Sequence, residues 1–300
     1  MSIRPVSRVS QATPTLEGAG VHLHRAFGFG DTGLTDPFLL LDDFRNDNPD
    51  QYVKGFPWHP HRGIETITYV LAGTVDHGDS MGNEGTIGAG DVQWMTAGSG
   101  IIHQEMPQGD TQGRMHGFQL WANLPADQKM SSPRYQEIVS GDIPEAVEDD
   151  GTRAKVVTGE FWGKRGPVEG IAADPVYLDV YVPPGVARSL PIDTRRQAFA
   201  YVFEGDGEFL DSSEPMPVPT EDMSTGLVRT ASDVRDRSLV LFSNGDEVRV
   251  RAGEQGVRFL LVSGRPLREP VAWHGPIVMN TQEQLRQAFA DLHNGTFLRE

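Results

Sequence analysis

Two short motifs carry the residues whose types and spacing could do chemistry: His59-Pro-His61 and His103-Gln-Glu105. Residues two apart in a β-strand project from the same face, so each motif can present two side chains together. If the two strands face each other across a small barrel, three imidazole nitrogens and one carboxylate oxygen converge. This donor set suits one divalent first-row metal with open positions for water, dioxygen or substrate, and iron is expected by analogy with other His/carboxylate oxygenase sites.

Glu65 leaves the role of the carboxylate open. It follows His61 by four residues and shares its face if the strand continues unbroken. It could therefore replace Glu105 as a ligand, orient an imidazole, or act as a base. Gly63 could host a bulge that resets the alternation, so the pattern alone does not choose.

The remaining histidines are predicted to have no metal. His22-Leu-His24 has the same spacing but no partner histidine and no Glu shortly downstream, so we predict a surface strand. His77, in Asp76-His-Gly-Asp79, is predicted to lie in a hairpin turn. His116, His274 and His293 are predicted to make ordinary hydrogen bonds. His116 is also a candidate for a pocket wall.

Other catalytic classes fit poorly. The chain has no cysteine, which excludes disulfides, a thiolate nucleophile and a sulfur-based zinc site. Gly28-Phe-Gly30 lacks the third glycine and the following helix of a dinucleotide fingerprint. Ser99 lacks the Gly-x-Ser-x-Gly elbow of a hydrolase and is predicted to lie in a turn.

Composition limits the partners. The 300 residues include 26 Lys+Arg and 42 Asp+Glu, a formal net charge of −16, which disfavours direct binding to nucleic acid or to anionic lipid. No apolar run approaches the ~18 residues of a membrane span, and no signal peptide is evident. We therefore expect a cytoplasmic protein without a membrane segment. A monomer is also expected, although no residue pattern sets the oligomeric state.

Short runs rich in β-formers must position these motifs. The 34 Gly and 21 Pro separate many such runs, which predicts an all-β barrel or sandwich. Examples are Glu65–Leu71, Asp91–Met95, Val176–Val182 and Val257–Val262. One helix is predicted near the end, where Thr281 and Gln284 form a capping box, an apolar stripe follows and Gly295 suits the stop.

A weak repeat indicates two related domains. Tyr69-Val-Leu-Ala-Gly73 aligns with Tyr201-Val-Phe-Glu-Gly205 at an offset of 132 residues (201 − 69). We predict an N-terminal domain over 1–132, a linker over 133–150 and a C-terminal domain over 151–300 that includes the helix. The acidic, Pro-rich stretch 211–222 is predicted to be a loop.

Gly55-Phe-Pro-Trp-His-Pro-His-Arg-Gly-Ile-Glu-Thr66 and Gly90-Asp-Val-Gln-Trp-Met-Thr-Ala-Gly-Ser-Gly-Ile-Ile-His-Gln-Glu105 resemble the two metal-binding motifs of cupins in the form used by the pirin family. Further segments, including Leu34–Phe44 and His116–Pro125, also resemble pirins. The resemblance implies an all-β bicupin of two stacked barrel domains with a C-terminal helix. It also implies one mononuclear iron in the N-terminal domain, held by His59, His61, His103 and Glu105.

In the register of the repeat, Pro191 and Asp193 stand where His59 and His61 stand, so the second domain is expected to lack the ligands. Pirin-like proteins have been associated with quercetin 2,3-dioxygenase activity and with iron-dependent transcriptional co-regulation. We therefore expect a dioxygenase that opens quercetin or a related enolic aromatic compound with O2, using Fe²⁺ and with Glu105 as the base. The alternative is a redox-sensing regulatory protein that binds a protein partner.

Overall fold

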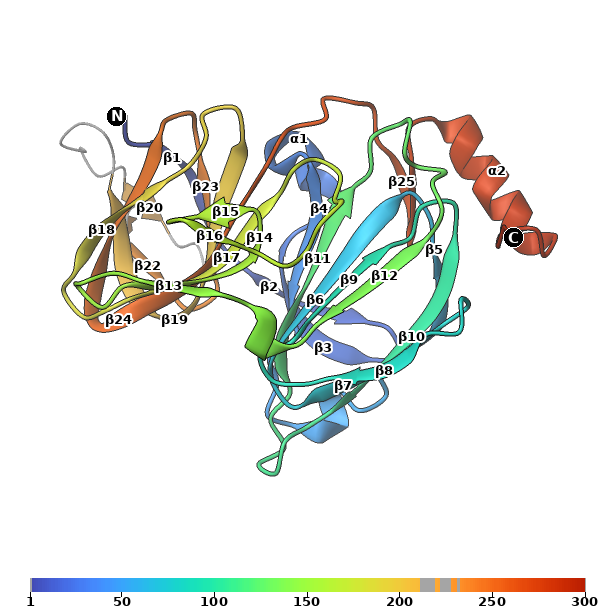
Figure 1. Cartoon of the computed structure of the whole chain (residues 1–300), viewed down its shortest axis with the longest axis horizontal. Coiled ribbons are helices and arrows are strands. Elements are labelled where there is room, and N and C mark those ends of the chain that lie inside the picture. The colour runs from blue at the N-terminus through green and yellow to red at the C-terminus, as the bar shows by residue number, and fades with distance from the viewer. Residues whose placement is uncertain (1, 211–218, 222–227, 231–232, 300) are drawn as a thin grey trace. The chain divides into compact units, whose positions relative to one another are not determined.

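The computed structural model describes residues 2–210, 219–221, 228–230 and 233–299, which divide into two compact units (Figure 1). The N-terminal unit comprises Thr13–Asp142, Gly170–Ala173 and Leu267–Glu300. The C-terminal unit comprises Met1–Ala12, Ile143–Glu169 and Asp174–Pro266. Both units are built almost entirely of antiparallel strands, which confirms the predicted all-β class.

Two antiparallel sheets form the framework of the N-terminal unit. The larger has the order β12 (Arg134–Ile138), β9 (Val92–Thr96), β6 (Ile64–Ala72), β11 (His116–Asn123), β4 (Phe38–Asp43), β3 (Val21–Phe27), β2 (Thr13–Glu17). The smaller has the order β5 (Phe56–His61), β10 (Ile101–Gln108), β7 (Thr74–Asp79), β8 (Glu84–Ile87). Short helical segments interrupt the strands at Phe29–Asp31, Thr32–Thr35 (α1) and Pro49–Gln51.

An apolar cluster joins residues of both sheets. Val70 of the larger sheet packs with Val75 and Ile87 of the smaller one. Alternate residues of a strand face opposite sides, so one face of each sheet points toward the other sheet. These inner faces carry the core of the unit. The histidine motifs lie on β5 and β10, in the smaller sheet.

The C-terminal unit is built on one large antiparallel sheet. Its order is β1 (Val6–Gln11), β23 (Ser238–Phe242), β19 (Gln197–Leu210), β24 (Glu247–Gly264), β17 (Val176–Val182), β14 (Arg153–Thr158), β13 (Glu145–Val147), with β18 (Ala187–Pro191) on β24 and β22 (Asp233–Arg235) on β19. Two further antiparallel pairs of short strands are β15 (Glu160–Phe161) with β16 (Lys164–Arg165) and β20 (Pro219–Glu221) with β21 (Val228–Thr230). Most of the predicted loop 211–222 lies outside the described residues, whereas Pro219–Glu221 form a strand.

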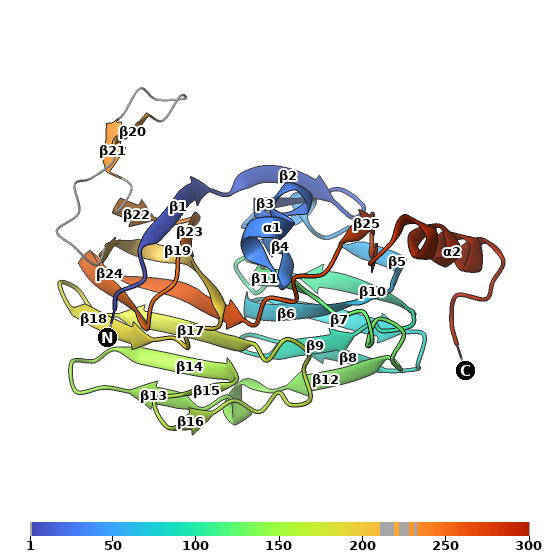
Figure 2. The ribbon, with the colours of Figure 1, turned by 90° about the horizontal axis from the view of Figure 1, so that it is seen from above.

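The predicted helix is present as α2 (Gln282–His293). The Thr281 side chain accepts a hydrogen bond from the Gln284 N–H, and the Gln284 side chain accepts one from the Thr281 N–H, as the capping box requires. Leu285 is buried and packs with the hairpin of β25 (Ala272–His274) and β26 (Ile277–Met279). Figure 2 shows this hairpin and α2 beside β5.

The two ends of the chain group differently from the linear domain limits. Residues 1–12 belong to the C-terminal unit, where β1 pairs with β23, and α2 belongs to the N-terminal unit. The sequence-based limits assigned both ends by their position along the chain. Strand pairing of β1 with β23 and packing of α2 on β25 and β26 connect residues that are far apart or ordered differently from the linear limits, and a local pattern does not contain those contacts.

Among the described residues, no helix is long and apolar enough to cross a membrane.

Candidate metal centre

Three histidine side chains meet on neighbouring strands of the smaller sheet. In the pairing of β5 with β10, His59 lies opposite His103, and His61 lies opposite Ile101. The ring centroids of His59 and His103 are 4.3 Å apart, and those of His61 and His103 are 5.0 Å apart. The two motifs therefore lie on hydrogen-bonded neighbouring strands, and not on strands that face each other across a barrel, which was the arrangement considered from the sequence.

Backbone carbonyl groups set the orientation of two of these imidazoles. His59 Nδ1 is 2.9 Å from the Pro57 carbonyl oxygen, and His61 Nδ1 is 3.1 Å from the Pro276 carbonyl oxygen. A carbonyl oxygen only accepts hydrogen bonds, so this network assigns the proton to Nδ1 of both rings. Nε2 of each ring then carries a lone pair.

The donor atoms fit a bound cation. The Nε2 atoms of His59 and His61 are 3.0 Å apart, so two lone pairs oppose each other without a proton between them. Both ring nitrogens of His103 are buried without a hydrogen-bond partner. A metal ion shared by the three rings would satisfy the Nε2 lone pairs of His59 and His61 and one nitrogen of His103, because neutral imidazole is a common ligand of divalent first-row metals. Within the described ranges, these three residues form the one group of this kind.

Burial favours the neutral form of two of the rings, His61 and His103. It lowers the pKa of His61 to about 3, and His59 adds to the effect. The pKa of His103 lies well below its ordinary value, because of burial and the adjacent histidines. A lone pair on neutral imidazole is what metal binding needs, so the three-histidine group could hold a metal ion near neutral pH.

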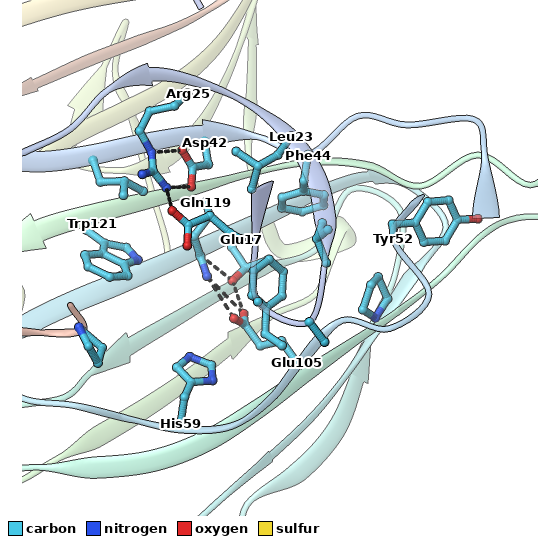
Figure 3. Close-up of a pocket in the computed structure, with 18 of the residues that line it drawn as sticks. Glu17, Leu23, Arg25, Asp42, Phe44, Tyr52, His59, Glu105, Gln119 and Trp121 are labelled. Carbon is cyan, nitrogen blue, oxygen red and sulfur yellow. Dashed lines mark hydrogen bonds and ion pairs between the residues drawn. The ribbon is translucent and has the colours of Figure 1, made fainter. Parts of the chain in front are cut away.

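Glu105 lies close to this group but makes other contacts. It is buried, and its Oε2 accepts a hydrogen bond of 3.0 Å from Gln119 Nε2. Thr68 Oγ1 lies 2.9 Å from Glu105 Oε1 and 2.9 Å from Gln119 Oε1, so its single proton can go to either oxygen. Figure 3 shows Glu105 and His59 on the same side of the pocket. The fourth ligand stays a prediction.

Glu65 does not join the site. The strand breaks after His61, because Gly63 has φ of +79° and a Cβ there would meet the Val278 carbonyl oxygen at 2.0 Å. Along β6, Glu65 lies three residues from Thr68, which lines the pocket, and so projects from the opposite face. Its Oε1 accepts a hydrogen bond of 2.8 Å from Thr96. Burial raises the pKa of Glu65 to about 7.

His77 lies in a strand, so the predicted turn position is wrong. It is the fourth residue of β7, stacks on Tyr135 at 4.9 Å and lies 5.6 Å from His103, between ring centroids. The turn begins after Asp79, whose Oδ1 accepts hydrogen bonds from the N–H groups of Met81 and Asn83. An aspartate can hold a turn by such bonds, so the turn follows Asp79 and does not include His77, where it was predicted.

A cavity of about 610 Å³ opens from the histidines, within the range of ~300–1,000 Å³ typical of small-molecule sites. Its aromatic walls include Phe29, Phe44, Tyr52, Phe56, Trp121 and Trp273. Figure 3 shows Arg25, Asp42 and Glu17 on the opposite side from His59 and Glu105. His116 is not among the lining residues and contacts Asp47 instead.

Arg25 and Asp42 form a charged pair on the far wall of the cavity. Arg25 Nε and Nη2 donate to the two oxygens of Asp42 at 2.8 and 2.7 Å, across paired strands β3 and β4. Burial raises the pKa of Asp42 to about 6 in spite of this pair. No substrate-contacting residue was predicted from the sequence, and Trp273 and Pro276 were not foreseen near the site because they lie more than 200 residues from His59 and His61.

Residues 20–122 match the Pirin family, and residues 177–298 match the Pirin C-terminal cupin domain. A pirin-like protein of Caulobacter vibrioides is 46% identical over 299 residues, which cover 99% of this chain and 100% of that protein. Human pirin is 38% identical over 280 residues, which cover 93% of this chain and 88% of that protein.

A solved structure has the same architecture. The crystal structure of a quercetin 2,3-dioxygenase from Acinetobacter baumannii superposes with a TM-score of 0.84 at 30% sequence identity and covers 99% of both chains. The two family matches, the sequence identity to pirin relatives and the two strand-built units all indicate the same family. The chain therefore belongs to the pirin family of the cupin superfamily and has its bicupin fold.

Proposed function

We propose that this chain is a metal-dependent dioxygenase that opens quercetin or a related enolic aromatic compound with O2. One mononuclear divalent metal, Fe²⁺, would be held by His59, His61, His103 and Glu105. The observation that carries the proposal is the convergence of three imidazoles at one side of an aromatic-walled cavity of about 610 Å³. The similarity to a quercetin 2,3-dioxygenase structure supports the same substrate class.

The bound metal would supply Lewis acidity toward the enol oxygen of the substrate and a redox centre for O2. The aromatic walls would orient the flat rings of the substrate and exclude water. Trp121 lies edge-on to His61 at 5.0 Å and 6.0 Å from Trp273, between ring centroids. Two indole rings near the proposed ligands provide a large apolar surface for a planar substrate.

Glu105 would accept the proton of the substrate hydroxyl. Its carboxylate lines the cavity and is held by Gln119 Nε2 at 3.0 Å and by the adjacent Thr68 hydroxyl at 2.9 Å. These contacts fix the position of the carboxylate at the cavity wall, and a general base must be held within reach of the proton that it accepts. For quercetin, the balanced outcome is quercetin plus O2 giving a depside plus carbon monoxide.

The test is turnover of quercetin by iron-loaded protein under oxygen. We expect a metal-dependent loss of flavonol absorbance with one carbon monoxide per quercetin, and the activity should disappear in His103→Ala. The matched control is His22→Ala, because His22 belongs to the second His-x-His pair and is exposed on β3. This variant should behave as the native protein.

Absence of metal-dependent turnover, or equal turnover by His103→Ala and native protein, would contradict the proposal. If partner capture from an extract then differs between ferrous, ferric and metal-free protein, the regulatory alternative replaces it. A monomeric state and a cytoplasmic location stay predictions of the sequence.

A further inference from the structure

The C-terminal segment Ala272–Phe297 reaches the histidine group from a distant part of the chain. The tip of its β25–β26 hairpin places the Pro276 carbonyl oxygen 3.1 Å from His61 Nδ1, across a separation of 215 residues. That hydrogen bond determines which nitrogen of His61 faces His59 and His103. The orientation of a proposed ligand therefore depends on where this hairpin lies.

Arg62, the residue after His61, holds the segment. Its side chain is 2% exposed, and Nη1 lies 2.7 Å from Asp291 Oδ2 on helix α2. Its Nη2 donates to the Phe297 carbonyl oxygen at 2.8 Å, and the guanidinium carbon lies 4.2 Å from the centroid of the Phe297 ring. The Arg62 Nε donates to the Ser99 carbonyl oxygen at 2.6 Å. Arg62 thus connects the end of β5, the turn before β10 and the C-terminal segment.

The backbone next to Arg62 is tied to the same hairpin. The Val278 N–H donates to the Arg62 carbonyl oxygen at 3.1 Å. Lys129 Nζ, itself buried, donates to the carbonyl oxygens of Gly63 at 2.9 Å and Val278 at 3.0 Å. The absence of a side chain at Gly63 permits this close approach. The hairpin is therefore fixed from two sides of the ligand strand.

We propose that Arg62 and Asp291 are positioning residues for metal binding: they hold the C-terminal segment so that the Pro276 carbonyl group fixes the ring of His61. The inference rests on the proposed function, because it takes His61 as a metal ligand. A buried guanidinium that loses its carboxylate is left without a counter-charge, so loss of Asp291 should loosen the segment and release the His61 ring.

The experiment compares cobalt(II) binding by purified, metal-free full-length proteins, measured by competition with a chelator and by d–d absorption. In Asp291→Asn, we expect Co²⁺ affinity to fall about 10–100-fold, the loss typical when a group that orients a metal ligand is removed. The d–d bands should also change, because they report the geometry around the ion and not the stability of the fold. Asp179→Asn is the matched control, since Arg258 binds both oxygens of Asp179 in the C-terminal unit.

A milder variant covers the case in which Asp291→Asn fails to fold. Gln287 Nε2 donates to Asp291 Oδ1 at 2.7 Å from an exposed position on α2. Gln287→Ala removes this one hydrogen bond and should lower Co²⁺ affinity roughly 2–10-fold. If Asp291→Asn and Gln287→Ala, or whichever of the two folds, keep the Co²⁺ affinity and d–d bands of the native protein, the inference is overturned. An equal loss of Co²⁺ affinity in Asp179→Asn would also overturn it.

The same measurements separate this inference from the proposed function. Native protein that binds no Co²⁺ overturns both, because then no ligand is positioned. Native iron-loaded protein that turns over no quercetin, while Asp291→Asn still loses Co²⁺ affinity, overturns the dioxygenase function alone. Full quercetin turnover with unchanged Co²⁺ binding in the variants overturns the positioning role alone.

Discussion

Replacement of Glu65 by glutamine should remove a pH-dependent loss of stability. The side chain is 1% exposed, and burial raises its pKa from 4.5 to about 7. Between these two values, the folded protein binds more protons at this site than the unfolded chain does. The free energy of unfolding therefore falls as pH rises through this window. At about 1.4 kcal/mol per pH unit, the full loss is about 3 kcal/mol and is present above pH 7.

Glu65→Gln retains an oxygen for the hydrogen bond of 2.8 Å from Thr96 but cannot ionise. We expect the variant and the native protein to have similar unfolding free energies near pH 4.5, where the native carboxyl is protonated. Above pH 7, the variant should be more stable by up to about 3 kcal/mol. Urea unfolding of both metal-free proteins at pH 5 and at pH 8 measures the difference, and the other titrating groups cancel because both proteins share them.

A constant difference between the two proteins at both pH values would refute this reasoning. Co²⁺ binding provides a second readout. Because Glu65 projects from the face of β6 opposite to Thr68, Glu65→Gln should bind Co²⁺ with native affinity. A loss of affinity comparable to that of His103→Ala would restore Glu65 as a candidate ligand.

Three further results are expected. Acidification below about pH 6.5 should cost the metal-free protein up to about 1.4 kcal/mol of unfolding free energy per pH unit for each buried imidazole, because the lowered pKa values of His61 and His103 make the unfolded chain the better proton acceptor. Urea unfolding of native protein and of His103→Ala from pH 7 to pH 5 measures this for one ring, because the opposite contributions of Glu65 and Asp42 are common to both proteins, and equal pH slopes would contradict it. Trp121→Leu should weaken quercetin binding roughly 2–10-fold through loss of an aromatic wall, as titration calorimetry can measure, whereas unchanged affinity would place the ligand elsewhere. Thr281→Ala should lower the unfolding free energy by about 1 kcal/mol through loss of the α2 cap, and thermal unfolding with no decrease would refute that role.

Local patterns were sufficient to predict much of the secondary structure. The runs beginning at Glu65, Asp91 and Val176 correspond to strands β6, β9 and β17, and the capping box at Thr281 begins α2. These features depend on residues within one element, where side-chain alternation or a cap acts over a few positions. His77 was misplaced because a glycine and two aspartates resemble a turn, whereas only Asp79 caps one.

The sequence by itself determined the strand-rich architecture, the family and the three histidines as the group worth testing, because their types and spacing are local. The tertiary structure decided that β5 and β10 are neighbours, that Glu65 faces away from the cavity, and that Pro276 orients His61. Each of these outcomes depends on strand pairing or on contacts across more than 200 residues. One backbone break at Gly63 changes which face every later residue of the strand presents, and only the packed chain reveals that break.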